Sequence, residues 1–175
     1  MIGRMIRNLK ETIISPSTAY PRIAEENELK LAAWVVCLTA VVACLTEGLD
    51  PIILTGAILA VLLGWQIETG LMHLTAKMLG AHGRRRTLLI GNAYAMTPMI
   101  YLTPLYLIGA DGLASVIGSV WSLCLNILAI KSAYSIGTGK AVGVMVMFYV
   151  ILFVICGVLV FSGAFDGILP EVQEL

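Results

Sequence analysis

The chain has 175 residues, of which 59% are hydrophobic and 13% charged, and its mean hydropathy is +0.93. Soluble domains carry about 25% charged residues, so this composition excludes an ordinary soluble domain and predicts an integral membrane protein. The formal net charge is zero, but the basic and acidic residues are segregated along the chain.

Residues 1–14, MIGRMIRNLKETII, are too polar to span a membrane and have an amphipathic pattern. The apolar residues recur at helical spacing: Ile2, Met5, Ile6, Leu9 and Ile13. The basic residues lie off this stripe: Arg4, Arg7 and Lys10. Such a helix either lies on an anionic leaflet or packs under the bundle, and both arrangements can hold.

The segment that follows is punctuated by prolines. SPSTAYP, residues 15–21, is expected to break the helix, because proline disfavours helix at and before itself. Residues 22–30 lead into the first span, and their acidic cluster is expected to be a solvated face. Its members are Glu25, Glu26 and Glu28.

Five segments are long and apolar enough, or nearly so, to cross about 30 Å of hydrocarbon. They are residues 30–46, 51–79, 87–108, 113–133 and 141–165. Pro98 and Pro104 are expected to kink the third. The second carries a face of small residues, Gly56, Ala60 and Gly64, which packs closely either within the chain or in a dimer.

Orientation follows from the basic residues, because short loops rich in Lys and Arg stay in the cytoplasm. With five spans, all 11 basic residues fall on one side. The other side receives only acidic residues: Glu47, Asp50, Asp111, Asp166, Glu171 and Glu174. We therefore expect a multi-pass protein of the cell membrane, with its N-terminus cytoplasmic and its C-terminus extracytoplasmic.

The predicted fold class is all-α, a polytopic membrane bundle of five transmembrane helices preceded by a cytoplasmic basic amphipathic helix. Three regions are expected. They are a cytoplasmic segment over 1–29, the five-helix domain over 30–165 and a short acidic extracytoplasmic tail over 166–175.

Glu68 is the clearest candidate for an intramembrane polar site. It lies about 13 Å along a continuous helix from Lys77, within the inner half of the bilayer. A charge at that depth needs a partner or a proton, and it serves either as a structural carboxyl, as a proton or cation site, or as a group facing a cytoplasmic vestibule. The polar residues expected around it are Gln66, His73, Asn92, Tyr94 and Asn126.

A second candidate is a cytoplasmic basic surface, which serves either as a topology anchor or as a contact for anionic head groups or a protein partner. It consists of Arg84, Arg85, Arg86 and Lys140 with Arg4, Arg7 and Lys10. No catalytic arrangement, metal site or cofactor site is legible, and no nucleic-acid partner is expected. The four cysteines lie in apolar runs and are interpreted as packing residues: Cys37, Cys44, Cys124 and Cys156.

Two stretches resemble the Yip1 domain family. They are LMHLTAKMLGAHGRRRTLLIGNAYAMTPMIYLTPLYLI (71–108) and VWSLCLNILAIKSAYSIGTGKAVGVMVMFYVILFVI (120–155). The resemblance covers about residues 10–165. It implies a five-helix membrane domain with a cytoplasmic N-terminus, and eukaryotic members bind Rab-type small GTPases and each other. The segment before the expected first span is shorter than their extended N-terminal region, so the resemblance is expected to be to a prokaryotic member.

Two functions remain open at this point. The first is a non-enzymatic membrane protein that acts through self-association, lipid contact or recruitment of a cytoplasmic partner, with a homodimer among the expected assemblies. The second is a small ion- or proton-coupled transporter or channel with its site around Glu68.

Overall fold

The computed structural model describes residues 2–45 and 51–162, and this part is helical, with no strand. Its helices are α1 (Ile2–Ile14), α2 (Pro16–Glu26), α3 (Leu29–Cys44), α4 (Pro51–Met78), α5 (Arg85–Ala95), α6 (Thr97–Tyr101), α7 (Thr103–Leu107), α8 (Asp111–Tyr134) and α9 (Thr138–Phe161). The all-α prediction is confirmed. The acidic residues predicted at 47, 50, 166, 171 and 174, and the tail 166–175, lie outside the described residues.

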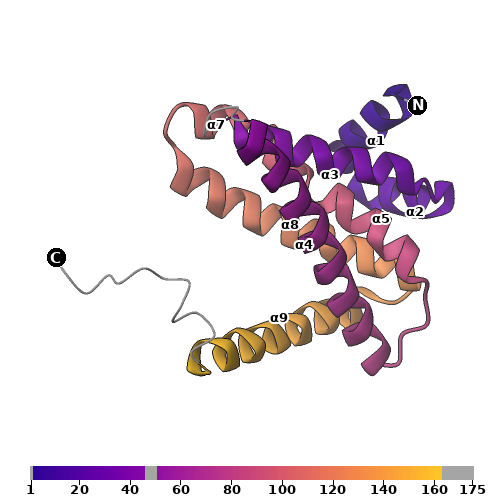
Figure 1. Ribbon diagram of the computed structural model, residues 1–175. Helices are drawn as coiled ribbons and strands as arrows, with labels where there is room; N and C mark the ends of the chain where they lie inside the picture. Colours follow the sequence, from indigo (N-terminus) through magenta and orange to yellow (C-terminus); the bar gives the residue numbers. More distant parts are fainter. Residues whose placement is uncertain (1, 46–50, 163–175) are drawn as a thin grey trace.

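The helices run back and forth between two ends of the molecule (Figure 1). The right-hand end holds α1, α2 and the connections α4–α5 and α8–α9. The left-hand end holds the start of α4, the α7–α8 connection and the end of α9. We call these the N-terminal end and the far end.

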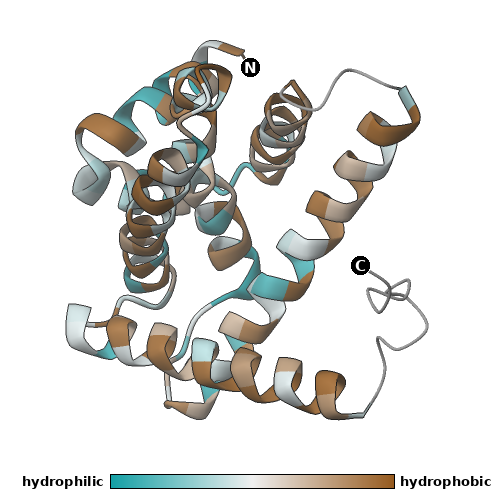
Figure 2. Cartoon of the chain, turned by 90° about the vertical axis from the view of Figure 1, so that its left-hand side faces the viewer, coloured by the Kyte–Doolittle hydropathy of each residue, from teal (hydrophilic) through white to brown (hydrophobic). Residues whose placement is uncertain are grey.

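Three helices, α4, α8 and α9, are long and apolar enough to cross a membrane. α3 is apolar but only 16 residues long. Large apolar side chains are exposed along the long helices, among them Leu63, Val120 and Phe153. Figure 2 shows α9 mainly brown, the colour of hydrophobic residues. Such surfaces suit lipid.

The predicted third span is divided into three helices. α5 ends at Ala95, and α6 and α7 each carry proline in their first turn, Pro98 and Pro104. Proline lacks an N–H and its ring clashes with the carbonyl four residues back, so the kinks expected at both prolines occur as helix breaks. Thr103 Oγ1 donates to the Ile100 carbonyl at 2.9 Å, which is the acceptor that Pro104 leaves unpaired.

The helix breaks within SPSTAYP, as predicted, but over a shorter stretch than the two prolines suggested. The interruption is confined to Ser15, and α2 starts at Pro16 and continues through Pro21. Pro16 is tolerated because the first helical N–H has no partner inside the helix. Ser17 and Pro21 are both exposed, so solvent can hydrate the Ser17 carbonyl that Pro21 cannot pair.

Two apolar clusters form the core. One joins α2, α3, α5 and α8 around Tyr20, Tyr94 and Leu125, and the other joins the end of α4 to α8 and α9 around Met72 and Ile130. Between α5 and α8 the backbones approach so closely that a Cβ at Gly91 would lie 2.9 Å from Ala129 Cβ.

The small-residue face of α4 is not used for packing within this chain. Gly56, Ala60 and Gly64 are exposed, and a Cβ at either glycine would meet nothing within 4 Å. Of the two arrangements expected for this face, the intramolecular one is therefore wrong, and the dimer remains a proposal.

Candidate functional site

Glu68 lies on a polar groove between helices. α4 is continuous through Gly70, so Glu68 sits in the middle of a long helix, half-buried. The groove has a volume of about 300 Å³. Its walls come from α4, α6, α7, α8 and α9, and its polar lining residues are Glu68, Tyr106, Ser115, Ser119, Ser122, Asn126 and Tyr149.

One face of α8 supplies most of this lining. Ser115, Ser119, Ser122 and Asn126 are spaced four, three and four residues apart, which places them on one side of a helix. They extend over about 16 Å at 1.5 Å per residue. The result is a continuous row of hydroxyl and amide oxygens opposite Glu68.

Asn126 is the innermost member of this row and is 8% exposed. In the described part of the chain its Oδ1 has no hydrogen-bond partner. Asn92, which is 1% exposed, lies within reach of the Glu68 carboxyl. Its Nδ2 donates to Thr69 Oγ1 at 3.0 Å, and its Oδ1 is likewise unpaired. The structure therefore places Asn92 and Asn126 beside Glu68.

The other three residues grouped with Glu68 belong elsewhere. Gln66 Oε1 accepts from Arg85 Nη2 at 3.1 Å, and the Gln66 carbonyl accepts from the same nitrogen at 3.2 Å. This pairing joins a predicted intramembrane residue to a predicted surface residue.

His73 and Tyr94 each have a different partner. His73 Nδ1 and the Tyr134 hydroxyl are 2.5 Å apart, and the two rings are stacked with their centroids separated by 5.9 Å. This pair joins α4 to the end of α8. The Tyr94 hydroxyl accepts from Asn8 Nδ2 at 3.5 Å, so Tyr94 faces α1 instead of Glu68.

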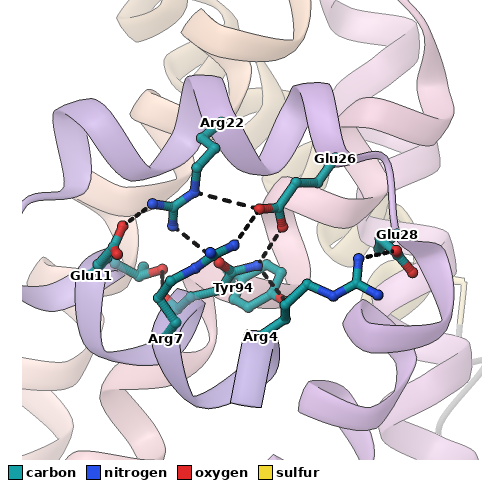
Figure 3. Close-up of polar contacts among 9 residues, drawn as sticks. Arg4, Arg7, Glu11, Arg22, Glu26, Glu28 and Tyr94 are labelled. Carbon is teal, nitrogen blue, oxygen red and sulfur yellow. Dashed lines mark hydrogen bonds and ion pairs between the residues drawn. The ribbon is translucent and has the colours of Figure 1, made fainter. Parts of the chain in front are cut away.

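An ion-pair cluster fixes α1 to α2 beside Tyr94 (Figure 3). Glu26 is its centre: it accepts from Arg7 Nη2 at 2.5 Å and from Asn8 Nδ2 at 2.9 Å, and Arg22 Nε lies 3.6 Å away. Arg22 also pairs with Glu11, and Arg4 pairs with Glu28 at 2.7 Å. The solvated-face prediction is therefore wrong for Glu26, which is 19% exposed, whereas Glu25 is exposed and Glu28 pairs with Arg4 at an exposed position.

The Yip1 domain model matches residues 10–161. The chain belongs to the Yip1 domain family. Neither the curated proteins nor the solved structures include a chain that matches it. Family membership and the apolar long helices together make it an integral membrane protein.

This Yip1 protein carries its basic residues on the elements of the N-terminal end. Several members of the predicted surface are held by other groups: Arg4 and Arg7 by glutamates, Arg85 by Gln66, Arg86 by the Asn27 carbonyl and Lys140 by the Gly80 carbonyl. Five exposed basic side chains have neither a hydrogen bond nor an ion pair among the described residues. We call them the basic face: Lys10, Lys30, Lys77, Arg84 and Lys131.

The serine row is what sequence reasoning missed in this Yip1 protein. Scattered serines in an apolar helix carry no strong local signal. The sequence could nevertheless have placed these serines and Asn126 on one helix face, because their spacing of four, three and four residues follows the helical period. Which helix faces that row depends on tertiary packing, so the groove could be identified only from the three-dimensional structure.

Proposed function

We propose that this Yip1 protein is a non-enzymatic, multi-pass protein of the cell membrane that acts at its N-terminal end. There it contacts anionic head groups or recruits a cytoplasmic partner, and it self-associates within the bilayer. The observation that carries the proposal is the segregation of charge. All 11 Lys and Arg residues lie in α1 or α2, or at those ends and connections of the other helices that meet at the N-terminal end, which the positive-inside tendency assigns to the cytoplasm.

The fixed position of α1 and α2 supports an interaction role. The Glu26 cluster holds the two helices against the bundle, and Asn8, Leu9 and Thr12 of α1 are buried. Ile2 and Ile6 of α1 stay exposed, at 65% and 57%. An amphipathic helix with free apolar side chains beside exposed cations matches the interfacial region of an anionic leaflet.

The test reverses three charges of the basic face, in the variant Lys10→Glu/Lys30→Glu/Arg84→Glu. Protein held in phosphatidylcholine nanodiscs is mixed with vesicles that contain or lack phosphatidylserine, and co-flotation is measured. Each basic residue near an anionic surface contributes about 1 kcal/mol. The variant should therefore bind at least about 100-fold more weakly, and salt should weaken the wild type.

The matched control adds carboxylates at the far end, with Gly112→Glu and Ser162→Glu, and should bind like the wild type. Equal binding of the wild type to vesicles with and without phosphatidylserine would contradict the lipid contact. An unchanged affinity of the triple variant would contradict the role of the basic face.

The polar groove favours a second candidate function. A half-buried carboxylate faces a row of hydroxyls on a membrane helix, which is the kind of site that ion and proton pathways use. On this account the protein is a small ion-coupled transporter or channel, and Glu68 carries its site.

A further inference from the structure

We propose that the groove is a half-channel which admits a monovalent cation from the far end of the bundle and binds it between Glu68 and Asn126. This inference rests on the second candidate function. It adds the identity of the ligand, the end from which the ligand enters, and the apolar residues that close the other end of the groove.

The groove offers only oxygen as a ligand atom on its polar side chains. Its polar lining consists of one carboxylate, five hydroxyls and the amide of Asn126. Among the described residues no basic side chain pairs with Glu68, and no cluster of His, Cys, Asp and Glu could hold a metal ion. Oxygen ligands with no thiolate or imidazole suit hard cations rather than zinc or copper.

The charge balance selects a singly charged ion. Divalent calcium and magnesium sites normally use more than one carboxylate or add substrate phosphates, whereas this groove holds Glu68 alone. One carboxylate neutralises one positive charge. The unpaired Oδ1 of Asn126, in a side chain that is 8% exposed, is an acceptor without a donor, and a bound cation would satisfy it.

The exposed members of the oxygen row lie toward the far end. Ser115 and Ser119 are exposed, and the hydroxyls of Tyr106 in α7 and Ser115 in α8 lie 3.5 Å apart across the α7–α8 connection. We place the mouth of the groove beside this pair. From Ser115 the row of oxygens leads inward to Asn126. At about 30 Å³ per water molecule, a groove of about 300 Å³ accommodates a hydrated ion that loses water as it moves inward.

Apolar residues close the groove toward the N-terminal end. One helical turn beyond Glu68, Asn126 and Tyr149 lie Met72, Ile130 and Met145, each of them buried, at 0%, 0% and 2% exposed. All three belong to the same core cluster. The polar path therefore ends at the Glu68 level, and release toward the other side would require this cluster to separate.

The experiment measures the thermal unfolding midpoint of the purified full chain in detergent as the concentration of NaCl, KCl or ethanolammonium chloride is raised. Choline chloride replaces the varied salt so that the ionic strength stays constant. A ligand of the folded state raises the midpoint in a saturable way. The wild type should respond to Na⁺ or K⁺. Glu68→Gln and Asn126→Leu should weaken the apparent affinity by at least about tenfold. Cys124→Ala, on an exposed position of the same helix, should behave like the wild type.

A second readout leaves the binding residues intact in case Glu68→Gln does not fold. In a variant with Ser119→Cys and the four native cysteines replaced, Na⁺ or K⁺ should slow modification of Cys at 119 by a water-soluble maleimide. Absence of any alkali-ion effect on both readouts, or an equal effect of choline, overturns the site. So does a response to ethanolammonium alone, which would indicate a lipid amine, or to pH alone, which would indicate protonation.

Flux of the same ion into proteoliposomes separates the site from the transport function. Saturable binding without flux would support the cation site and contradict the transport function. Flux without detectable binding in either readout would support the transport function and contradict this groove as the ion path.

Discussion

At the scale of single residues, burial decides which ion pairs matter. Glu26 is 19% exposed and is approached by Arg7, Asn8 and Arg22, whereas the side chains of Arg4 and Glu28 are 53% and 37% exposed. Exposed pairs contribute about 0–1 kcal/mol because water and salt screen them. Removing a part-buried charge leaves its partners unsatisfied, which costs about 1–3 kcal/mol.

Glu26→Gln is therefore expected to loosen α1, and Glu28→Gln is its matched control. Glu26→Gln should lower the unfolding midpoint and speed hydrogen exchange of the α1 amides, while Glu28→Gln should change both only slightly. Exchange in α1 that rises equally in the two variants would contradict the central place of Glu26.

Gly83 is a second residue whose substitution has a clear physical consequence. A Cβ there would lie 2.4 Å from Tyr134 Cδ1 and 2.6 Å from the Ala133 carbonyl oxygen. Because a backbone oxygen cannot move aside cheaply, Gly83→Ala should destabilise the protein by about 1–3 kcal/mol. Gly143→Ala in α9, where a Cβ meets nothing within 4 Å, should stabilise by about 0.5–1 kcal/mol. Thermal unfolding of both variants checks the contrast, and equal effects would contradict it.

At the scale of helices, the sequence was most informative where apolar runs are long. The expected spans 51–79 and 113–133 agree closely with α4 and α8. The expected span 87–108 became three helices, because two prolines six residues apart interrupt the hydrogen-bond ladder twice. Which polar groups meet Glu68 depends on the rotation of neighbouring helices. The structure places Asn92 and Asn126 beside Glu68 and gives Tyr94, Gln66 and His73 other partners.

The exposed small face of α4 leads to a prediction about self-association. We expect Gly56 and Gly64 to let two α4 helices approach closely in lipid, so Gly56→Leu/Gly64→Leu should lower dimerisation measured by energy transfer in proteoliposomes. Gly157→Leu in α9, also in open space, is the control. A dimer that tolerates both leucines on α4 would exclude this face as the seam.

At the scale of the whole molecule, the charge pattern carries the topology that we propose. Three helices satisfy the length and composition of a span, while α3 is short and the third segment is broken. The proposed five-span topology needs both of these segments as crossings in addition to the three long helices. The alternation of connections between two ends (Figure 1) supports the five-span topology, and the basic face and the half-channel both depend on which end is cytoplasmic.

Cysteine accessibility in sealed vesicles of known orientation tests this topology most directly. Single cysteines replace His82, Ser135, Gly109 or Ser162 in a variant without native cysteines, and a membrane-impermeant maleimide is added from one side. We predict that Cys at 82 and 135 reacts only from the cytoplasmic side, and that Cys at 109 and 162 reacts only from the opposite side. Reaction of Cys at 82 and at 109 from the same side would contradict the five-span account and the functions proposed from it.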